Sequence, residues 1–288
     1  MQPKIFLLGL LLAGSFSASA QARKVEKAIV KMKTEIQFPE NFGGGPGGGP
    51  GGGEGGDRAV MIGGPGGVES NVTTYYRGDF TKIESQSDFG NNMVIIDHQQ
   101  KKTTTLIEAM GRKTGFYSTE ADNEAMRARM DSARKVRRDS LEKAGIPVGE
   151  PRKPTIEYRE DTKKIAGYTC KKALVKSIDQ RGETNVTTVW YCPDFKIEQQ
   201  APGAGGGGRG PMGGGMMFGM NGLDQIDGFP MEIELERNNG MKVHTVVTSV
   251  KLDAQIDDKI FVIPKDYDLK PMSEMQNGNG RVIMRMGN

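Results

Sequence analysis

The chain has 288 residues, with 39 Lys and Arg against 36 Asp and Glu, a formal net charge of +3. Such a balance gives no global field to attract nucleic acid, and the length allows one large domain or two small ones. With two histidines and no nucleophile elbow, HExxH motif, phosphate loop or dinucleotide fingerprint, the sequence favours a protein that is not an enzyme and needs no cofactor.

Residues 1–22 have the layout of a secretory signal peptide. Lys4 precedes an apolar run from Ile5 to Leu12, and small residues follow up to Ala20 and Ala22, near which we expect cleavage. The apolar run is far shorter than the ~20 residues that span a bilayer, and no later segment is apolar enough. The sequence therefore predicts a periplasmic or secreted protein that does not span the membrane.

Two windows, residues 43–67 and 201–222, hold 26 of the 41 glycines. Glycine does not recur strictly every third residue, as in collagen, and no strand and helix frame a phosphate-binding fingerprint. We interpret both windows as flexible insertions between strands. The second also carries Met212, Met216, Met217 and Met220, whose soft sulfurs suit Cu(I), so a copper-handling loop stays open as an alternative.

Short alternating segments rich in Val, Ile, Thr and Tyr fill most of the remaining chain. Residues 230–237 show the pattern well, because Met231, Ile233 and Leu235 alternate with glutamates. The segments recur about every ten residues, which indicates an antiparallel meander rather than βαβ units. The expected strands are 29–38, 71–77, 79–88, 92–98, 102–110, 154–162, 166–178, 184–192, 230–237 and 241–252.

One helix is expected at about 119–144, inside a single domain that spans 23–270. Thr119 and Asp122 have the spacing of a capping box, and Gly145 followed by Pro147 ends the helix. The basic run within it predicts a solvated face, and contact with anionic lipid headgroups is the alternative. Residues 271–288 are expected to form a flexible tail.

The two cysteines, Cys170 and Cys192, lie on strands that flank a turn at 179–183. A hairpin centred on Arg181 places residues with an index sum of 362 directly opposite each other, and these two satisfy it. Opposite Cα atoms lie about 4.5–5.5 Å apart, which a disulfide tolerates. In an exported protein the spacing predicts a Cys170–Cys192 disulfide; a redox pair or a metal site is the alternative.

Four motifs in the C-terminal half occur in a recognisable order. They are KKIAGYTCKKALV (163–175), TTVWYCPDF (187–195), LDQIDGFPMEIELE (223–236) and DDKIFVIPKDYDL (257–269). With them, the chain resembles a family of exported bacterial proteins known as a domain of unknown function (number 4412), which is in turn similar to the LolA/LolB-type lipoprotein carriers. The resemblance implies a mainly β (α+β) fold, in which a strongly curved antiparallel sheet forms a half-barrel with helical elements over its mouth.

Such a sheet, with one dry face, predicts an exported, non-enzymatic binding protein for an acyl chain, lipid or lipoprotein, with a possible partner protein in the envelope. The alternatives are the copper-handling protein and a structural or interaction protein with glycine-rich contact loops. Strand alternation selects six candidate ligand-lining residues: Val94, Ile96, Leu106, Trp190, Ile233 and Val246.

Overall fold

The computed structural model describes residues 22–39, 67–88, 90–145, 153–178, 184–197, 223–237 and 240–277. Nearly all of the predicted signal peptide, both glycine-rich windows except Gly67, and the end of the tail lie outside these residues. The four methionines of the proposed copper loop lie outside them as well.

Fourteen strands and two α-helices make up the described chain, with two short 3₁₀ helices. In order they are β1 (Arg23–Val25), β2 (Lys27–Gln37), β3 (Val68–Arg77), β4 (Phe80–Ser87), β5 (Gly90–Asp97), β6 (Lys102–Ala109), β7 (Arg112–Ser118), α1 (Glu120–Lys143), β8 (Thr155–Ile165), β9 (Tyr168–Ile178), β10 (Thr184–Cys192), β11 (Phe195–Ile197), η1 (Leu223–Gln225), β12 (Phe229–Glu236), β13 (Lys242–Leu252), η2 (Asp258–Phe261), β14 (Asp268–Pro271) and α2 (Met272–Asn277).

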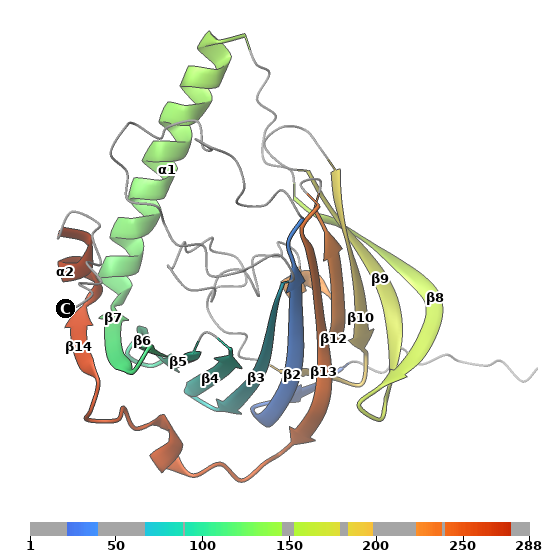
Figure 1. Ribbon diagram of the computed structural model, residues 1–288. Coiled ribbons are helices and arrows are strands. Elements are labelled where there is room, and N and C mark those ends of the chain that lie inside the picture. Colours follow the sequence, from blue (N-terminus) through green and yellow to red (C-terminus); the bar gives the residue numbers. More distant parts are fainter. Residues whose placement is uncertain are drawn as a thin grey trace, which may run out of the picture.

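Twelve of these strands form one long, strongly bent sheet in the order β14-β7-β6-β5-β4-β3-β2-β13-β12-β10-β9-β8 (Figure 1). Its ladders are antiparallel except that β14 pairs parallel with β7. A second, two-stranded sheet pairs β1 with β11, also in parallel. The predicted fold class, a mainly β protein built on a curved antiparallel sheet with one long helix, is confirmed. Alternation did not predict the edge strand β14, nor β1, β7 and β11.

The register of the ladders assigns each side chain to one of two faces, because directly opposite residues share a face. Val30, Thr74, Ile83, Val94, Thr105 and Phe116 are successive partners across β2 to β7, and we call their side the Val30 face. We call the other side the Glu232 face. Its members include Ile95 and Leu106 on β5 and β6.

The principal core lies on the Val30 face of β2, β3, β10, β12 and β13. Val30, Val189 and Ala28 are fully buried, and Val30 belongs to the alternating segment 29–38 that the sequence predicts as a strand. The small sheet adds Phe195, whose ring lies 5.3 Å from that of Phe229 and 5.2 Å from that of Tyr168. This aromatic cluster ties β11 to the first residues of β9 and β12.

On β4 to β7 both faces hold buried side chains. Lys82, Ile95, Thr104 and Leu106 are buried on the Glu232 face, and Thr81, Ile96 and Ser118 are buried on the Val30 face. We call residues 253–267, which connect β13 to β14, the strap. Phe261 of the strap packs on Phe80 with ring centres 5.4 Å apart, and the Arg77 guanidinium lies over both rings and pairs with Asp258. Further along, Leu106 is fully buried, and a Cβ added at Gly115 would come within 2.7 Å of it.

The helix α1 begins as the sequence predicts. The Thr119 hydroxyl accepts a hydrogen bond from the Asp122 amide, and the Asp122 carboxylate accepts one from the Thr119 amide, so the capping box is confirmed. Most of its described side chains are exposed, and Figure 1 shows it rising from the end of β7. The expected tail after Pro271 starts with the helical turn of α2. No helix among the described residues has the length and apolar character to cross a membrane.

Candidate functional site

A buried carboxylate, Glu232, lies at the centre of a polar cluster on the Glu232 face. The alternation of β12 predicts that its glutamates face solvent, and Glu234 and Glu236 do so. Glu232 is 8% exposed, because Trp190 and Val246 flank it as direct partners on β10 and β13. A buried charge is costly unless other charges and hydrogen bonds compensate it.

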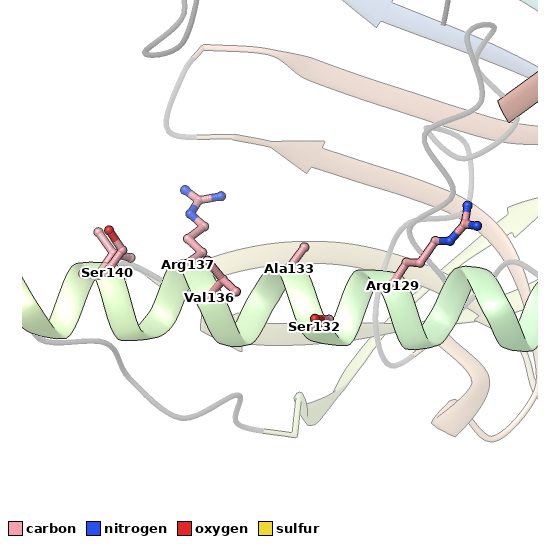
Figure 2. A pocket seen from close by; sticks show the side chains of 7 residues that line it. Arg129, Ser132, Ala133, Val136, Arg137 and Ser140 are labelled. Atoms are coloured by element: carbon pink, nitrogen blue, oxygen red, sulfur yellow. The ribbon is translucent and has the colours of Figure 1, made fainter. Parts of the chain in front are cut away.

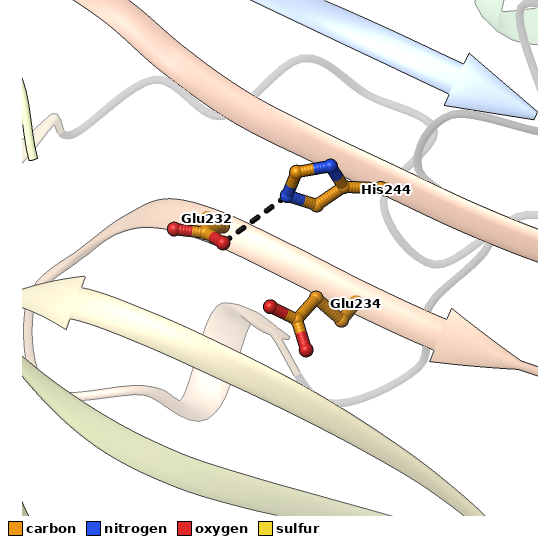
Figure 3. A group of neighbouring side chains, drawn as sticks. All are labelled: Glu232, Glu234 and His244. Atoms are coloured by element: carbon orange, nitrogen blue, oxygen red, sulfur yellow. Dashed lines mark hydrogen bonds and ion pairs between the residues drawn. The ribbon is translucent and has the colours of Figure 1, made fainter.

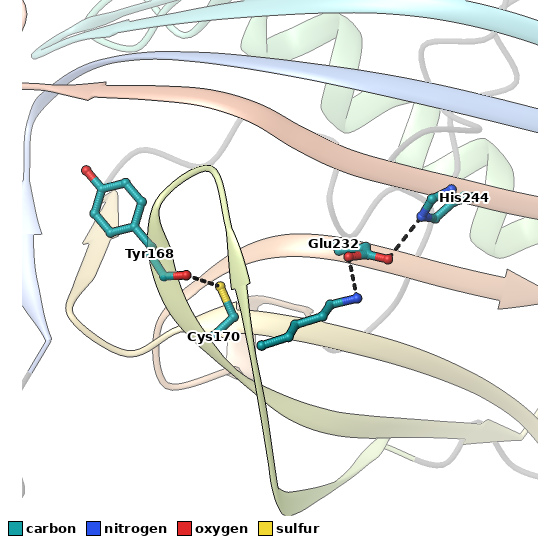
Figure 4. A network of polar contacts seen from close by, with 5 residues as sticks. Tyr168, Cys170, Glu232 and His244 are labelled. Atoms are coloured by element: carbon teal, nitrogen blue, oxygen red, sulfur yellow. Dashed lines mark hydrogen bonds and ion pairs between the residues drawn. The ribbon is translucent and has the colours of Figure 1, made fainter.

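Two cationic or polar groups compensate Glu232 (Figure 4). The Lys163 ammonium donates to one carboxylate oxygen at 2.6 Å, and the His244 Nε2 lies 3.1 Å from the other. Burial alone would raise the pKa of Glu232, but the hydrogen bonds from Lys163 and His244 outweigh it and hold that pKa below its ordinary value. Glu232 is therefore ionised at neutral pH.

Trp190 provides an aromatic surface for the lysine that reaches Glu232. The Lys163 ammonium lies 4.3 Å from the Trp190 ring centre, and the Lys172 ammonium lies 5.7 Å from it. A cation over an aromatic ring is stabilised by about 0.5–2 kcal/mol, depending on how far it is desolvated. The ring therefore holds Lys163 near Glu232 while the carboxylate attracts it.

His244 lies between carboxylates on both neighbouring strands. It is the direct partner of Glu234 on β12 and of Glu35 on β2. The candidate ligand atoms of Glu232, Glu234 and His244 all lie within 4.8 Å of one another (Figure 3). One imidazole nitrogen and two carboxylates are the donor set that divalent transition metals accept in proteins.

Sequence reasoning missed this cluster, although a signal for it was present. The β12–β13 ladder has an index sum of 478, which follows from centring the hairpin on its Asn-Asn-Gly turn. That sum places His244 opposite Glu234 from the order of the residues alone. Nothing in the alternation, however, identifies Glu232 as the buried member of the glutamate series.

A second candidate site is an apolar strip on the Val30 face of β4 to β7, which we call the shelf. Its members, Ile83, Val94, Ile107 and Phe116, are half-buried. Ile83, Val94 and Phe116 lie in one cross-strand row with Thr105, and Ile107 lies in the adjacent row. The same row starts at fully buried Val30 and Thr74, so the shelf continues the core surface outward.

The six predicted ligand-lining residues do not share a face. Val94, Ile96 and Ile233 lie on the Val30 face, where Val94 is half-buried and the other two are buried. The other three, Leu106, Trp190 and Val246, lie on the Glu232 face. The structure thus brings Trp190 and Val246 together beside Glu232, and it places Val94 on the shelf.

The predicted register of the cysteine hairpin is correct, but the predicted disulfide is not present. The index sum of 362 recurs from Thr184 opposite Ile178 to Tyr191 opposite Lys171. The ladder stops there, one pair short of the cysteines, where the register between β10 and β12 shifts. Cys170 and Cys192 are free, buried thiols, and burial raises the pKa of Cys170 to about 11.

A hollow of about 620 Å³ runs along α1 (Figure 2), but it borders neither candidate site. Its described lining comes from a single helix face: Arg129, Ser132, Ala133, Val136, Arg137, Ser140 and Leu141. None of the six predicted lining residues is among them.

Together these features define a mainly β protein with a long bent sheet, a buried ionic cluster on one face and an apolar shelf on the other. Residues 152–267 match the family model described as a domain of unknown function (DUF4412), as the resemblance in the sequence predicts. A comparison with curated protein sequences found no match.

Several solved structures are similar at low identity. PNGF-II is 14% identical, with 87% of this chain and 32% of that chain covered and a TM-score of 0.38. MucB is 10% identical, with 86% and 61% covered and a TM-score of 0.37. A LolA superfamily protein from Nitrosomonas europaea is 9% identical, with 85% and 94% covered and a TM-score of 0.30. The chain spans about a third of PNGF-II and less than two thirds of MucB, and the function proposed below rests on the chain's own residues.

Proposed function

We propose that this chain is an exported, non-enzymatic binding protein that holds an acyl chain of a lipid or lipoprotein on the shelf. The observation that supports it is the change of burial along one cross-strand row. Val30 and Thr74 are at most 1% exposed, whereas their successors Ile83, Val94 and Phe116 are half-buried. An apolar strip that continues a closed core but is only partly covered is the kind of surface that binds an apolar ligand.

The dimensions of the shelf suit an unbranched chain. Strands in a sheet lie about 4.8 Å apart, so a ligand crossing from β4 to β7 would contact about 14 Å of apolar surface. Each methylene removed from water contributes about 0.8 kcal/mol, which makes several of them sufficient for measurable binding. Thr105, in the middle of the row, offers a hydroxyl that can orient a polar group of the ligand.

Two features of the sequence support export and a binding function. A signal peptide cleaved near Ala20 or Ala22 would deliver the chain to the periplasm or the exterior, where lipids and lipoproteins of the envelope are in reach. The scarcity of histidine and of catalytic motifs favours binding over catalysis. A protein of the envelope that delivers or accepts the ligand is the partner this function requires.

The test uses the full chain stripped of lipid and titrated with palmitic acid. Binding to the folded state alone raises the melting temperature in a saturable way, and native mass spectrometry should show one fatty acid per chain. The Val94→Lys variant places a charge on the shelf and should abolish both signals.

Val186→Lys is the matched control, because Val186 is an exposed valine, 43% accessible, on distant β10. It should bind palmitic acid like the unmodified chain. Wild-type protein that shows neither a bound fatty acid nor a gain in melting temperature would contradict the proposal, and so would a Val94→Lys variant that binds normally.

A further inference from the structure

The β12–β13 hairpin presents an imidazole and two carboxylates to one point on the Glu232 face, opposite the shelf. We propose that Glu232, Glu234 and His244 bind a divalent transition metal, with Zn²⁺ as the best-fitting ion, and that Lys163 occupies the cation position when no metal is bound. This site is independent of the acyl-chain proposal, since it lies on the other face of the sheet and shares no residue with the shelf.

The spacing of the first two ligands already fits a metal. Zn²⁺ binds imidazole nitrogen and carboxylate oxygen at about 2.0–2.2 Å in tetrahedral geometry, which places two ligand atoms about 3.4 Å apart. The observed separation between Glu232 Oε1 and His244 Nε2 is 3.1 Å. Little movement is needed for both atoms to contact one ion.

The third ligand is close and free to move. Glu234 is exposed, and its carboxylate lies within 4.8 Å of the other two ligand atoms. Directly opposite residues on antiparallel strands have Cβ atoms about 4.5–5.5 Å apart, so Glu234 and His244 can converge by side-chain rotation alone. The backbone ladder therefore fixes the site before the ion arrives.

Lys163 is the competitor that the ion must displace. Its ammonium lies 2.6 Å from Glu232 Oε2, and Lys163 is only one-third exposed, so it neutralises the buried carboxylate in the metal-free protein. The Trp190 ring, 4.3 Å away, can keep the released ammonium beside the site at little cost. Metal binding then exchanges one cationic partner of Glu232 for another and does not leave the buried charge unpaired.

The donor set favours a transition metal over Mg²⁺ or Ca²⁺. An imidazole ligand suits Zn²⁺, Ni²⁺ or Cu²⁺, whereas the hard cations take oxygen ligands in greater number. Three protein ligands leave a fourth position for water or for a group on a ligand. Glu35, the partner of His244 on β2, adds negative charge on that side and is itself bound to Lys33 at 3.0 Å.

The experiment titrates Zn²⁺ alone into the full chain, by calorimetry and by equilibrium dialysis with metal analysis. We expect one Zn²⁺ per chain, and a loss of affinity of at least tenfold in His244→Ala. His98→Ala is the matched control, because the other histidine lies in a separate turn bonded to Thr81 at 3.0 Å, and its removal should change nothing. Glu234→Gln, an exposed change that is safe for folding, should also weaken binding.

A second variant reports on the displaced lysine with the opposite sign. Lys163→Met keeps an apolar stem on Trp190 but removes the competing charge, so Zn²⁺ should bind more tightly, by about tenfold. Absence of Zn²⁺ binding by the wild type would overturn the proposal. Equal affinity in His244→Ala would overturn it too, and unchanged or weaker binding in Lys163→Met would remove Glu232 from the ligand set.

Discussion

The two ends of the long sheet differ in which of their faces are buried. Around β2, β10, β12 and β13 the core lies on the Val30 face, where Val30 and Val189 are fully buried, and the Glu232 face carries the ionic cluster. On β4 to β7 the Glu232 face is buried as well, at Ile95 and Leu106, while the Val30 face holds the half-buried shelf next to buried Thr81 and Ile96. A continuous ladder therefore need not have one continuous dry side.

The strap explains why the Glu232 face is buried at this end of the sheet. After β13 the chain crosses to the far edge of the sheet, and it does so on the Glu232 face, where Phe261 packs on Phe80. Arg77 secures the crossing through the Phe80 and Phe261 rings and the ion pair with Asp258. The face without the strap is left partly open, and that is where the proposed ligand lies.

The largest effect is expected from adjacent residues on β6 that point to opposite faces. Leu106→Ala empties a fully buried position and should lower the free energy of unfolding by about 3–5 kcal/mol, measured by urea denaturation. Ile107→Ala, on the half-buried shelf, should cost about 1 kcal/mol. Equal costs for the two variants, or a larger cost for Ile107→Ala, would show that the Glu232 face is not the more deeply buried one at β6.

The ionic cluster predicts a dependence of stability on acid. Because the pKa of Glu232 in the folded protein lies below its ordinary value of 4.5, Glu232 contributes stability above pH 4.5 that is lost as the pH falls through the folded pKa. Glu232→Gln should lower the free energy of unfolding at pH 7 by about 1–3 kcal/mol and flatten its decline as the pH falls below 4.5.

Glu236→Gln is the control for that measurement, since Glu236 is exposed on the same strand. It should keep the stability and the acid dependence of the wild type. If the two variants have the same acid profile, the buried position of Glu232 makes no difference and the cluster is ordinary surface charge.

These contrasts show how far the sequence predicts the molecule. Alternation identified ten of the fourteen described strands and missed β1, β7, β11 and β14. The Thr119 capping box was readable from spacing, and index sums gave the register of the cysteine hairpin correctly. Alternation shows which residues of one strand share a face, but it does not show which face of the next strand matches it. Val94 and Leu106 were therefore chosen together as lining residues although they lie on opposite faces. Directly opposite residues in the β5–β6 ladder have an index sum of 199, which pairs Val94 with Thr105 and Met93 with Leu106.

Other outcomes depended on non-local packing, which no short pattern contains. The strap covers part of the Glu232 face next to β4, and its contacts join residues far apart in the chain, such as Phe80 and Phe261. The disulfide prediction was wrong because the ladder ends at the register shift near Tyr191, which depends on β12 as well as on β9 and β10. The burial of Glu232 likewise requires side chains from three other strands.

The smallest effect tests whether the two ends differ only in their faces or also in their turns. The β8–β9 hairpin turns at Ala166 and Gly167, with φ of 48° and 89°, and the β6–β7 hairpin turns at Met110 and Gly111, with φ of 50° and 73°. Both positive angles are typical of a type I′ turn, for which Asn-Gly is the preferred sequence.

Ala166→Asn and Met110→Asn should each relieve a left-handed strain and raise the free energy of unfolding by about 0.5–1 kcal/mol. Met110 is 84% exposed, so the substitution loses no packing. Similar gains in stability at both hairpins, measured by urea denaturation, would show that the two ends differ in their buried faces and not in their turns. A gain at Ala166 alone would instead show that the β6–β7 turn is held by contacts of its own.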